Sequence, residues 1–240
     1  MTAVRAEENV AVEVVDLGVT PLRELNARLH RRAGETGGPR RWQVLNPNGA
    51  HALACGLDAG IEVEIVGHAG YYCAGMNKLA TVLVRGNAGP GLAENMMSGT
   101  VVVDGSASQS AGASGHGGLL VIHGDAAARC GISLKGLDIV VRGSIGHMSA
   151  FMAQSGCLVV CGGAGAGLGD SLYEARVYVR GEVAGLGADC VEKELRREHE
   201  AEVRALLDRA GIDDVDASEF RRYGSGRRLY NFQVDNAGLY

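Results

Sequence analysis

Aliphatic runs that end in glycine recur along the chain at a fixed spacing of 19 residues. Each of seven units also carries a small residue three positions after the glycine and another four positions later, as G-x-x-[GAS]-x-x-x-[GA]. A repeat without gaps predicts units that stack in register and bury their apolar faces against one another. The closing glycines, which we expect to form structural turns, are Gly67, Gly86, Gly105, Gly124, Gly143, Gly162 and Gly181.

The length of the unit restricts the fold. Nineteen residues are too few for a strand–helix–strand crossover, which needs about thirty. The units lack the fixed leucines and asparagine of leucine-rich repeats, and the aliphatic residue every six positions of a left-handed hexapeptide helix. Glycine after each strand is expected to permit a sharp corner. We predict an all-β fold: a single-stranded, right-handed parallel β-helix with 19-residue coils, flanked by short N- and C-terminal α-helices.

The flanks differ from the repeat. Thr20-Pro21 is typical of a helix start, and residues 42–59 resemble an irregular first coil. Residues 190–210 have an amphipathic pattern, and Asp216 with Glu219 predicts a capping box for a short helix. The predicted organisation is an N-terminal extension with one helix (1–41), the β-helix domain (42–189), and a C-terminal helical cap and tail (190–240). Aromatic residues make the tail resemble a docking arm, and they are Tyr223, Tyr230, Phe232 and Tyr240.

One face of the predicted strand ladder raises the question of what covers it. Alternate strand residues point outwards, and six of them form an apolar stripe: Leu83, Val102, Val121, Val140, Val159 and Tyr178. Only Glu64, in the first unit, breaks it. A bare stripe would be a large exposed apolar patch. We expect the chain's own C-terminal helix to cover it, and a partner subunit is the alternative.

The search for catalytic, cofactor-binding or metal-binding residues identifies none. Cys157 and Cys161 are about 13 Å apart on one extended strand, too far to share a metal. Cys73 and Cys130 occupy equivalent positions three coils apart, so they cannot form a disulfide. The histidines show no metal-binding spacing, and the glycine-rich run 161–169 lacks the lysine of a phosphate-binding loop. The thiols are expected to be buried, small hydrophobic groups.

Several turn segments are richer in methionine and aromatic residues than a coil requires. Adjacent residues such as Met96 and Met97 cannot both point inwards, and these residue types are enriched at protein interfaces. A subunit interface and gap filling inside the solenoid are both consistent with the pattern. The candidate interface residues are Tyr71, Tyr72, Met76, Asn77, Asn95, Met96, Met97, His147, Met148, Phe151, Met152 and Gln154.

Composition excludes some partners. The 240 residues include 37 glycines and only four prolines, which indicates many tight turns in an ordered chain. A net charge of -5 without a basic patch disfavours nucleic acid. No run is long enough to span a membrane, and the first ten residues do not resemble a signal peptide. Six cysteines without a disulfide or metal pattern favour a reduced, cytoplasmic setting.

The repeat resembles the GXGXG domain, which forms the C-terminal part of the glutamate synthase large subunit and also occurs in formylmethanofuran dehydrogenase. The resemblance covers residues 60–189. Segments within the repeat and beside it indicate which kind of GXGXG protein the chain resembles most. TPLRELN, GYYCAGMNK, AENMMSGT, SQSAGASGHGGL, GHMSAFMAQSG, LGADCVEKE and RRYGSGRRLYNFQVDN are similar to the stand-alone GXGXG subunit of N-methylglutamate synthase and glutamate synthase-like complexes.

This resemblance implies a cytoplasmic hetero-oligomer in which the chain has no catalytic residue of its own. The partners would be a class II glutamine amidotransferase subunit and a glutamate synthase-like subunit that carries FMN and an iron–sulfur cluster. The complex would be a glutamate synthase-like oxidoreductase or a methylamine–glutamate N-methyltransferase. The β-helix would position the catalytic subunits and wall a path for ammonia or amine.

Two other functions are compatible with a β-helix. One is the corresponding subunit of a formylmethanofuran dehydrogenase-like metalloenzyme, which the flanking segments disfavour. The other is a free-standing β-helix enzyme that acts on carbohydrate. Such an enzyme needs a groove with clustered charged or aromatic residues, and the sequence shows no such cluster.

Overall fold

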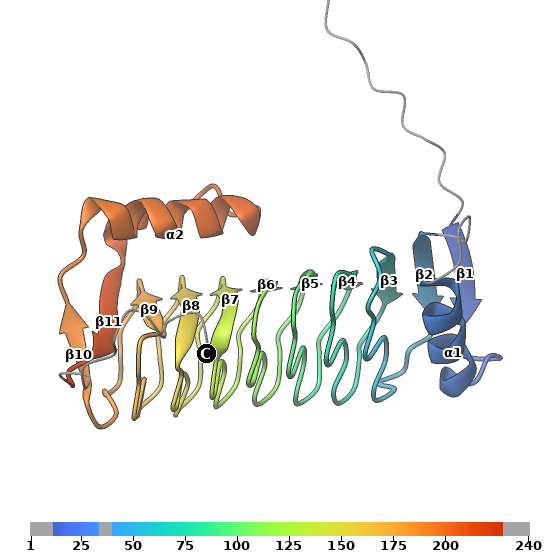
Figure 1. The fold of residues 1–240 in the computed structure, drawn as a ribbon, viewed down its shortest axis with the longest axis horizontal. Helices are drawn as coiled ribbons and strands as arrows, with labels where there is room; N and C mark the ends of the chain where they lie inside the picture. Colours follow the sequence, from blue (N-terminus) through green and yellow to red (C-terminus); the bar gives the residue numbers. More distant parts are fainter. Residues whose placement is uncertain (1–11, 34–39, 228–240) are drawn as a thin grey trace, which may run out of the picture.

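The computed structural model describes residues 12–33 and 40–227, and its strands form one sheet of eleven strands in the order β1-β2-β3-β4-β5-β6-β7-β8-β9-β11-β10 (Figure 1). The first strands and helix are β1 (Val12–Asp16), α1 (Leu22–Ala33) and β2 (Arg41–Leu45). The repeat supplies β3 (Glu62–Val66), β4 (Thr81–Val84), β5 (Thr100–Val103), β6 (Leu119–Ile122), β7 (Lys135–Val141), β8 (Ser155–Val160) and β9 (Arg176–Val179). The C-terminal elements are β10 (Cys190–Lys193), α2 (Arg197–Arg209), the short 3-10 helix η1 (Ala217–Glu219) and β11 (Arg221–Ser225).

The repeated strands pair in parallel with residues 19 positions away. Val82 pairs with Val101, Val101 with Leu120, and the same register continues through Val177. Each coil contributes this strand and a bridge at position +2, in a line that runs from Ala69 to Val183, and the Gly162 coil adds a bridge from Leu168 to Leu186. The predicted parallel β-helix with one strand per coil is therefore confirmed. We name each coil by its closing glycine and number positions from that glycine.

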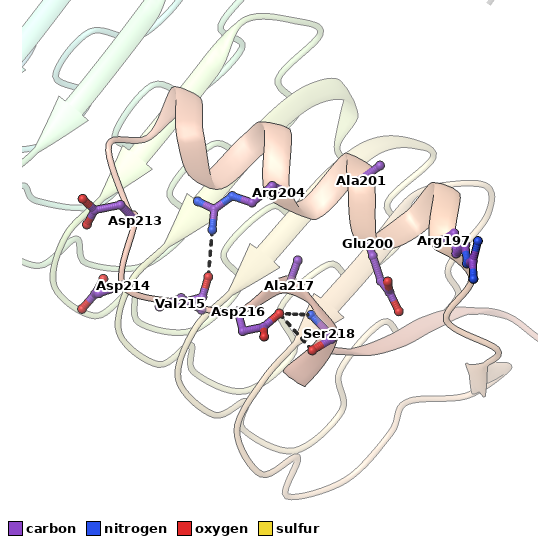
Figure 2. A pocket seen from close by; sticks show the side chains of 10 residues that line it. All are labelled: Arg197, Glu200, Ala201, Arg204, Asp213, Asp214, Val215, Asp216, Ala217 and Ser218. Atoms are coloured by element: carbon purple, nitrogen blue, oxygen red, sulfur yellow. Dashed lines mark hydrogen bonds between the residues drawn. The ribbon is translucent and has the colours of Figure 1, made fainter.

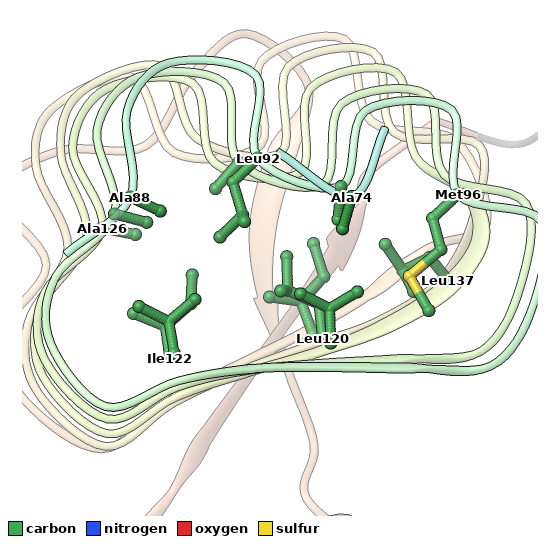
Figure 3. Packing of buried hydrophobic residues seen from close by; sticks show 14 of the residues in the cluster. Ala74, Ala88, Leu92, Met96, Leu120, Ile122, Ala126 and Leu137 are labelled. Atoms are coloured by element: carbon green, nitrogen blue, oxygen red, sulfur yellow. The ribbon is translucent and has the colours of Figure 1, made fainter. Parts of the chain in front are cut away.

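The interior of the solenoid is filled by columns of apolar side chains. Figure 3 looks along these columns, with alanines stacked at position +2, Leu92 at +6, and Leu120 and Ile122 on the strands. Cys73 and Cys130 are fully buried in the +6 column, as the sequence predicted for small hydrophobic thiols. Burial raises the pKa of each of these thiols to about 12, so both remain protonated.

The closing glycines have a different role from the one that the sequence suggested. Of the seven, only Gly67 has a positive φ, at 133°. A Cβ on Gly86 would lie 2.7 Å from the carbonyl carbon and oxygen of Gly67, and a Cβ on Gly181 would lie 2.6 Å from the oxygen of Gly162. Glycine is needed in this column because successive backbones pass too close for any side chain, and not because the corner needs a special conformation.

The turn after each strand has an alternating backbone. In the six coils from Gly67 to Gly162, the residues at +5, +7 and +9 all have positive φ. The +7 residue is buried in every one of these coils, and it is always alanine or glycine. A left-handed conformation combined with burial therefore explains the second small residue of the sequence repeat. The +5 and +9 residues have the same left-handed conformation, but only Gly91 among them is buried, so packing does not limit the size of the others.

A polar ladder runs along the corner beside the glycines. At position +1 the side chain of each coil accepts a hydrogen bond from the +1 backbone N–H of the next coil. His68 Nδ1 accepts from Asn87 at 2.9 Å, and Asn87 Oδ1 accepts from Ser106 at 2.8 Å. The ladder continues through Ser106, Asp125 and Ser144 to Gly163. This ladder satisfies a backbone donor in each coil.

The N-terminal end of the stack is closed by α1. The helix begins after Pro21, as predicted, and Leu25 and Leu29 are fully buried against the first coils. Asn26 donates to the carbonyl of Ala52 at 2.9 Å and accepts from the N–H of Ala54 at 3.1 Å. The sequence did not predict β1, which pairs in parallel with β2 and extends the sheet into the predicted N-terminal extension.

The C-terminal end departs from prediction in three ways. The expected helix over 190–210 is wrong at its start, because Cys190–Lys193 forms β10 and α2 begins only at Arg197. The expected docking arm is wrong at Tyr223, which is buried in β11, and the other tail aromatics lie outside the described residues. β11 pairs antiparallel with both β9 and β10, so it joins the last repeat strand to β10, which ends the sheet. Asp216 caps η1 through Ser218, but Glu219 pairs instead with Arg180 at 3.4 Å.

Helix α2 covers much of the outer apolar stripe. It runs along the stack, as Figure 1 shows. Val203, Leu206 and Leu207 of α2 belong to one buried cluster with the outer residues Val121, Val140, Val159 and Tyr178. Val102 packs at the edge of this cluster, and Leu83 is only half-buried. The prediction that the chain covers its own stripe is therefore confirmed for β6 to β9.

Candidate subunit interface

In two coils the +5 and +9 positions of the turns carry large apolar side chains. In the Gly67 coil these residues are Tyr72 and Met76, which are 53% and 57% exposed. With their neighbours they make a first turn patch, which consists of Tyr71, Tyr72, Met76, Leu79 and Met97. All five side chains are at least 47% exposed.

The aromatic rings of the first turn patch form a connected group. The ring of His51 stacks on Tyr71 with centroids 4.5 Å apart, and Tyr71 meets Tyr72 edge-on at 6.4 Å. The Tyr72 ring extends over the next coil, since a Cβ on Gly91 would lie 2.5 Å from its Cδ1. These contacts hold the rings in place and leave their outer surfaces free for binding.

A second turn patch lies four coils further along the same side of the solenoid, and it consists of Met148, Phe151 and Met152. Met152 is 39% exposed, and Met148 and Phe151 are half-buried. Met148 repeats the arrangement of Tyr72, because a Cβ on Gly167 would lie 2.8 Å from its sulfur. In both patches a large +5 side chain therefore lies over a glycine of the next coil.

The structure places two predicted interface residues in the interior instead. Met96 is fully buried in the core, next to the exposed Met97. Asn77 is also fully buried, and its Nδ2 donates to the carbonyls of Ala80 and Ser98 at 2.8 and 3.2 Å. The prediction that Met96 and Asn77 lie at a subunit interface is therefore wrong, because both occupy position +10, which faces the core. Asn95, His147 and Gln154 are exposed on the turns as expected.

Beneath α2 lies a polar cluster that sequence reasoning missed. Arg176 donates two hydrogen bonds to Glu202, at 2.9 and 2.7 Å, and one to Cys157 Sγ at 3.2 Å. Tyr178 donates to Glu202 at 2.6 Å. Burial acts to raise the pKa of Glu202, but the hydrogen bonds from Arg176 and Tyr178 outweigh it and hold that pKa below its usual value.

This cluster attaches α2 to the sheet. Arg209 adds an ion pair to Asp138 at 3.1 Å, and Arg142 adds one to Asp214 at 2.7 Å. Burial raises the pKa of the Cys157 thiol to about 12 in spite of the neighbouring guanidinium, so the thiol remains neutral. Every polar group of the cluster has a partner within the chain, which indicates helix docking.

An open hollow lies between α2 and the loop that follows it (Figure 2). As in the cluster beneath α2, its central polar side chain is bonded within the chain. Arg204 crosses it and donates to the carbonyls of Val215 and Ile212 at 2.9 and 2.6 Å. The hollow is lined by Arg197, Glu200, Ala201, Arg204, Asp213, Asp214, Val215, Asp216, Ala217 and Ser218. Its central cation already bonds the loop backbone, so the hollow is explained by local packing.

Two further searches concern the described residues alone. Across 12–33 and 40–227, no group of three or more histidine, cysteine or acidic side chains could hold a metal ion. Within the same ranges, neither helix has the length and apolar character needed to cross a membrane. FMN and iron–sulfur binding by a partner stays a prediction.

Comparison with known proteins identifies a close relative. No protein-family model matches the chain. The curated protein GlxC of Rhizobium meliloti (strain 1021) is 60% identical over 227 residues, which cover 95% of this chain and 99% of GlxC. At this identity over nearly the full length of both proteins, the chain belongs to the same family as GlxC.

Proposed function

We propose that this chain is the scaffold subunit of a heteromeric glutamate synthase-type complex. The observation that carries the proposal is the pair of exposed methionine and aromatic patches on a solenoid of identical, register-locked coils. Membership of the GlxC family and the resemblance to GXGXG subunits support the same class of complex. The proposed partners are a class II glutamine amidotransferase chain and a chain that carries FMN and an iron–sulfur cluster.

The physical role is positioning. The coils are held by strand pairing, the +2 bridges and the +1 ladder, so the distance between two points on the surface is fixed. Eleven strands at about 4.8 Å spacing make a rod of about 48 Å. Such a rod can hold two catalytic chains at a set separation and wall a path for a small amine between them. Within this class we propose N-methylglutamate synthase, which acts in the cytoplasm.

Co-expression tests the proposal. The chain is produced together with a class II glutamine amidotransferase chain and a chain that carries FMN and an iron–sulfur cluster, both from the same organism, and the mixture is separated by size. We expect one stable complex that contains all three chains and shows flavin absorbance. Failure of the chain to co-elute with either partner, or turnover of a carbohydrate by the isolated chain, would refute the proposal.

The substrate is tested on the same complex. The complex is supplied either with methylamine and glutamate, which would give N-methylglutamate and ammonia, or with ammonia, 2-oxoglutarate and a two-electron reductant, which would give glutamate. Mass spectrometry of the products separates the two activities. The proposal expects N-methylglutamate with methylamine. Formation of glutamate alone would assign the complex to ordinary glutamate synthesis.

A further inference from the structure

Four residues of the two turn patches have a backbone conformation that bulky side chains avoid. Tyr72, Met76, Met148 and Met152 have φ values of 59°, 55°, 55° and 52°. In this left-handed region the Cβ of an L-residue crowds the following carbonyl, so glycine, asparagine and aspartate are favoured there. Any residue with a Cβ is strained at these positions, whatever its size, and Asn95, Ser110 and Arg129 share the conformation. The four residues differ from their equivalents in having large apolar side chains.

The other coils of the same chain show that the fold does not need them. At +5, the equivalents of Tyr72 and Met148 are Gly91, Ser110, Arg129 and Gly167. At +9, the equivalents of Met76 and Met152 are Asn95, Ser114, Ser133 and Ser171. Large apolar residues at these positions are confined to the two turn patches. There they combine this conformation with apolar side chains that are exposed or, for Met148, half-buried, which points to a binding role outside the chain.

The spacing of the patches limits what can bind them. They are four coils apart, which corresponds to about 19 Å. A standard protein interface covers about 800 Å² on each partner, and so is about 28 Å across. A domain of 200 residues has a radius of gyration of about 16 Å and exceeds 30 Å in width. Two such domains cannot each be centred on one patch, whereas one domain covers both.

Positive charge between the two patches indicates which groups the partner must carry. The Gly124 coil presents two exposed cationic side chains, Arg129 on its turn and Lys135 at the start of β7. Neither forms an ion pair with any residue in the described ranges. An interface over this coil would leave both cations unpaired unless the partner supplies carboxylates.

We propose that a single partner protein docks across both turn patches, with two apolar recesses about 19 Å apart and carboxylates that meet Arg129 and Lys135. The inference rests on the proposed function, because it assigns one of the two partner chains to the turn face. The other chain must then bind elsewhere on the rod.

The test replaces each strained residue by one that the chain itself carries at the equivalent position. The variants are Tyr72→Gly with Met76→Asn in the first patch, and Met148→Gly with Met152→Ser in the second. Ser110→Gly, in the same column between the patches, is the matched control. Each variant is titrated separately with the purified amidotransferase chain and the purified flavoprotein chain, and its thermal midpoint is measured.

We expect each patch variant to weaken the same single partner by about 10- to 30-fold, and the combined variant to abolish its binding. The thermal midpoint should be unchanged or raised, because strain is removed. Ser110→Gly should bind normally. A second variant combines Tyr72→Asn with Met148→Asn, and asparagine tolerates the left-handed conformation. It should show the same loss of partner binding as the combined glycine variant.

Four results would overturn the inference. The first two concern binding: the combined variant binds normally, or each patch variant loses a different partner. The third is a clear fall in thermal midpoint for both the glycine and the asparagine variants, and the fourth is self-association of the wild-type chain through these residues. In each of these cases the wild-type complex can still form. Failure of the wild-type chain to bind either partner would instead remove the proposed function itself.

Discussion

Replacing Gly124 by alanine tests whether close stacking is what the glycine column provides. Gly124 donates from its N–H to the carbonyl of Gly105 at 2.9 Å. A Cβ at Gly124 would lie 2.8 Å from the carbon and oxygen of that carbonyl and 2.5 Å from Ser106 Oγ. Ordinary contact requires at least 3.4 Å. The two coils must therefore separate locally, against the hydrogen bonds that hold them.

The expected loss follows from two opposing terms. Overpacking in a rigid interior costs about 1–3 kcal/mol, while replacing glycine by alanine recovers about 0.4–1 kcal/mol from the unfolded chain. The net destabilisation is about 1–2 kcal/mol, which lowers the thermal midpoint by about 2–8 °C in a chain of this size. Urea and thermal unfolding, followed by circular dichroism, measure it.

Gly60 provides the matched control for this substitution. It is exposed, has no heavy atom within 4 Å of a built Cβ and lacks a positive φ. Gly60→Ala should therefore be neutral or stabilising by a few tenths of a kcal/mol, up to about 1. If Gly124→Ala were as stable as Gly60→Ala, the backbones would not be in the close contact that we describe.

Three further predictions concern the ladder and α2. Asn87→Ala removes the acceptor for the Ser106 N–H and should lower the free energy of unfolding by about 1 kcal/mol, whereas Asn87→Asp, which keeps an oxygen, should lose less in a urea titration. Folding lowers the pKa of Glu202, so the contribution of its carboxylate to stability is present at neutral pH and is lost as the pH falls below the ordinary glutamate pKa of 4.5. Glu202→Gln should lower the free energy of unfolding by about 1–2 kcal/mol at pH 7 and make stability depend less steeply on acid pH, and an unchanged acid profile would contradict the assignment. Leu207→Ala should cost about 2–4 kcal/mol and speed hydrogen exchange in α2 before the β4 and β5 coils, and uniform acceleration would show that α2 is not a separate unit.

The sequence predicted the solenoid because its repeat has a single period. Strand pairing at 19-residue spacing and the inward columns follow directly from positions of aliphatic residues, and small residues marked where backbones are close. What could not be predicted was the reason for each small residue. A glycine that avoids a neighbouring coil and an alanine in a left-handed turn give the same pattern in one sequence.

The ends of the sheet and the orientation of the turn residues were harder to predict from sequence, for physical reasons. β1 and β10 lie at the two ends of the sheet and β11 lies between β9 and β10, and the pairing of these three strands does not follow the 19-residue repeat. Residues 190–193 have a pattern that suits a helix, but they form β10 because β11 offers a partner strand. Asn77 is polar and follows an exposed methionine, so its inward orientation depends on the alternating turn backbone, which sequence does not reveal.

Methionine oxidation tests most directly whether the turn face binds a partner. Exposed thioethers react with peroxide far faster than buried ones, and Met96 is a fully buried internal reference beside the exposed Met97. In the free chain we expect Met76, Met97 and Met152 to oxidise rapidly and Met96 slowly, as measured by mass spectrometry of peptides. In the assembled complex all four should be slow, whereas continued rapid oxidation of both Met76 and Met152 would show that the partners bind elsewhere.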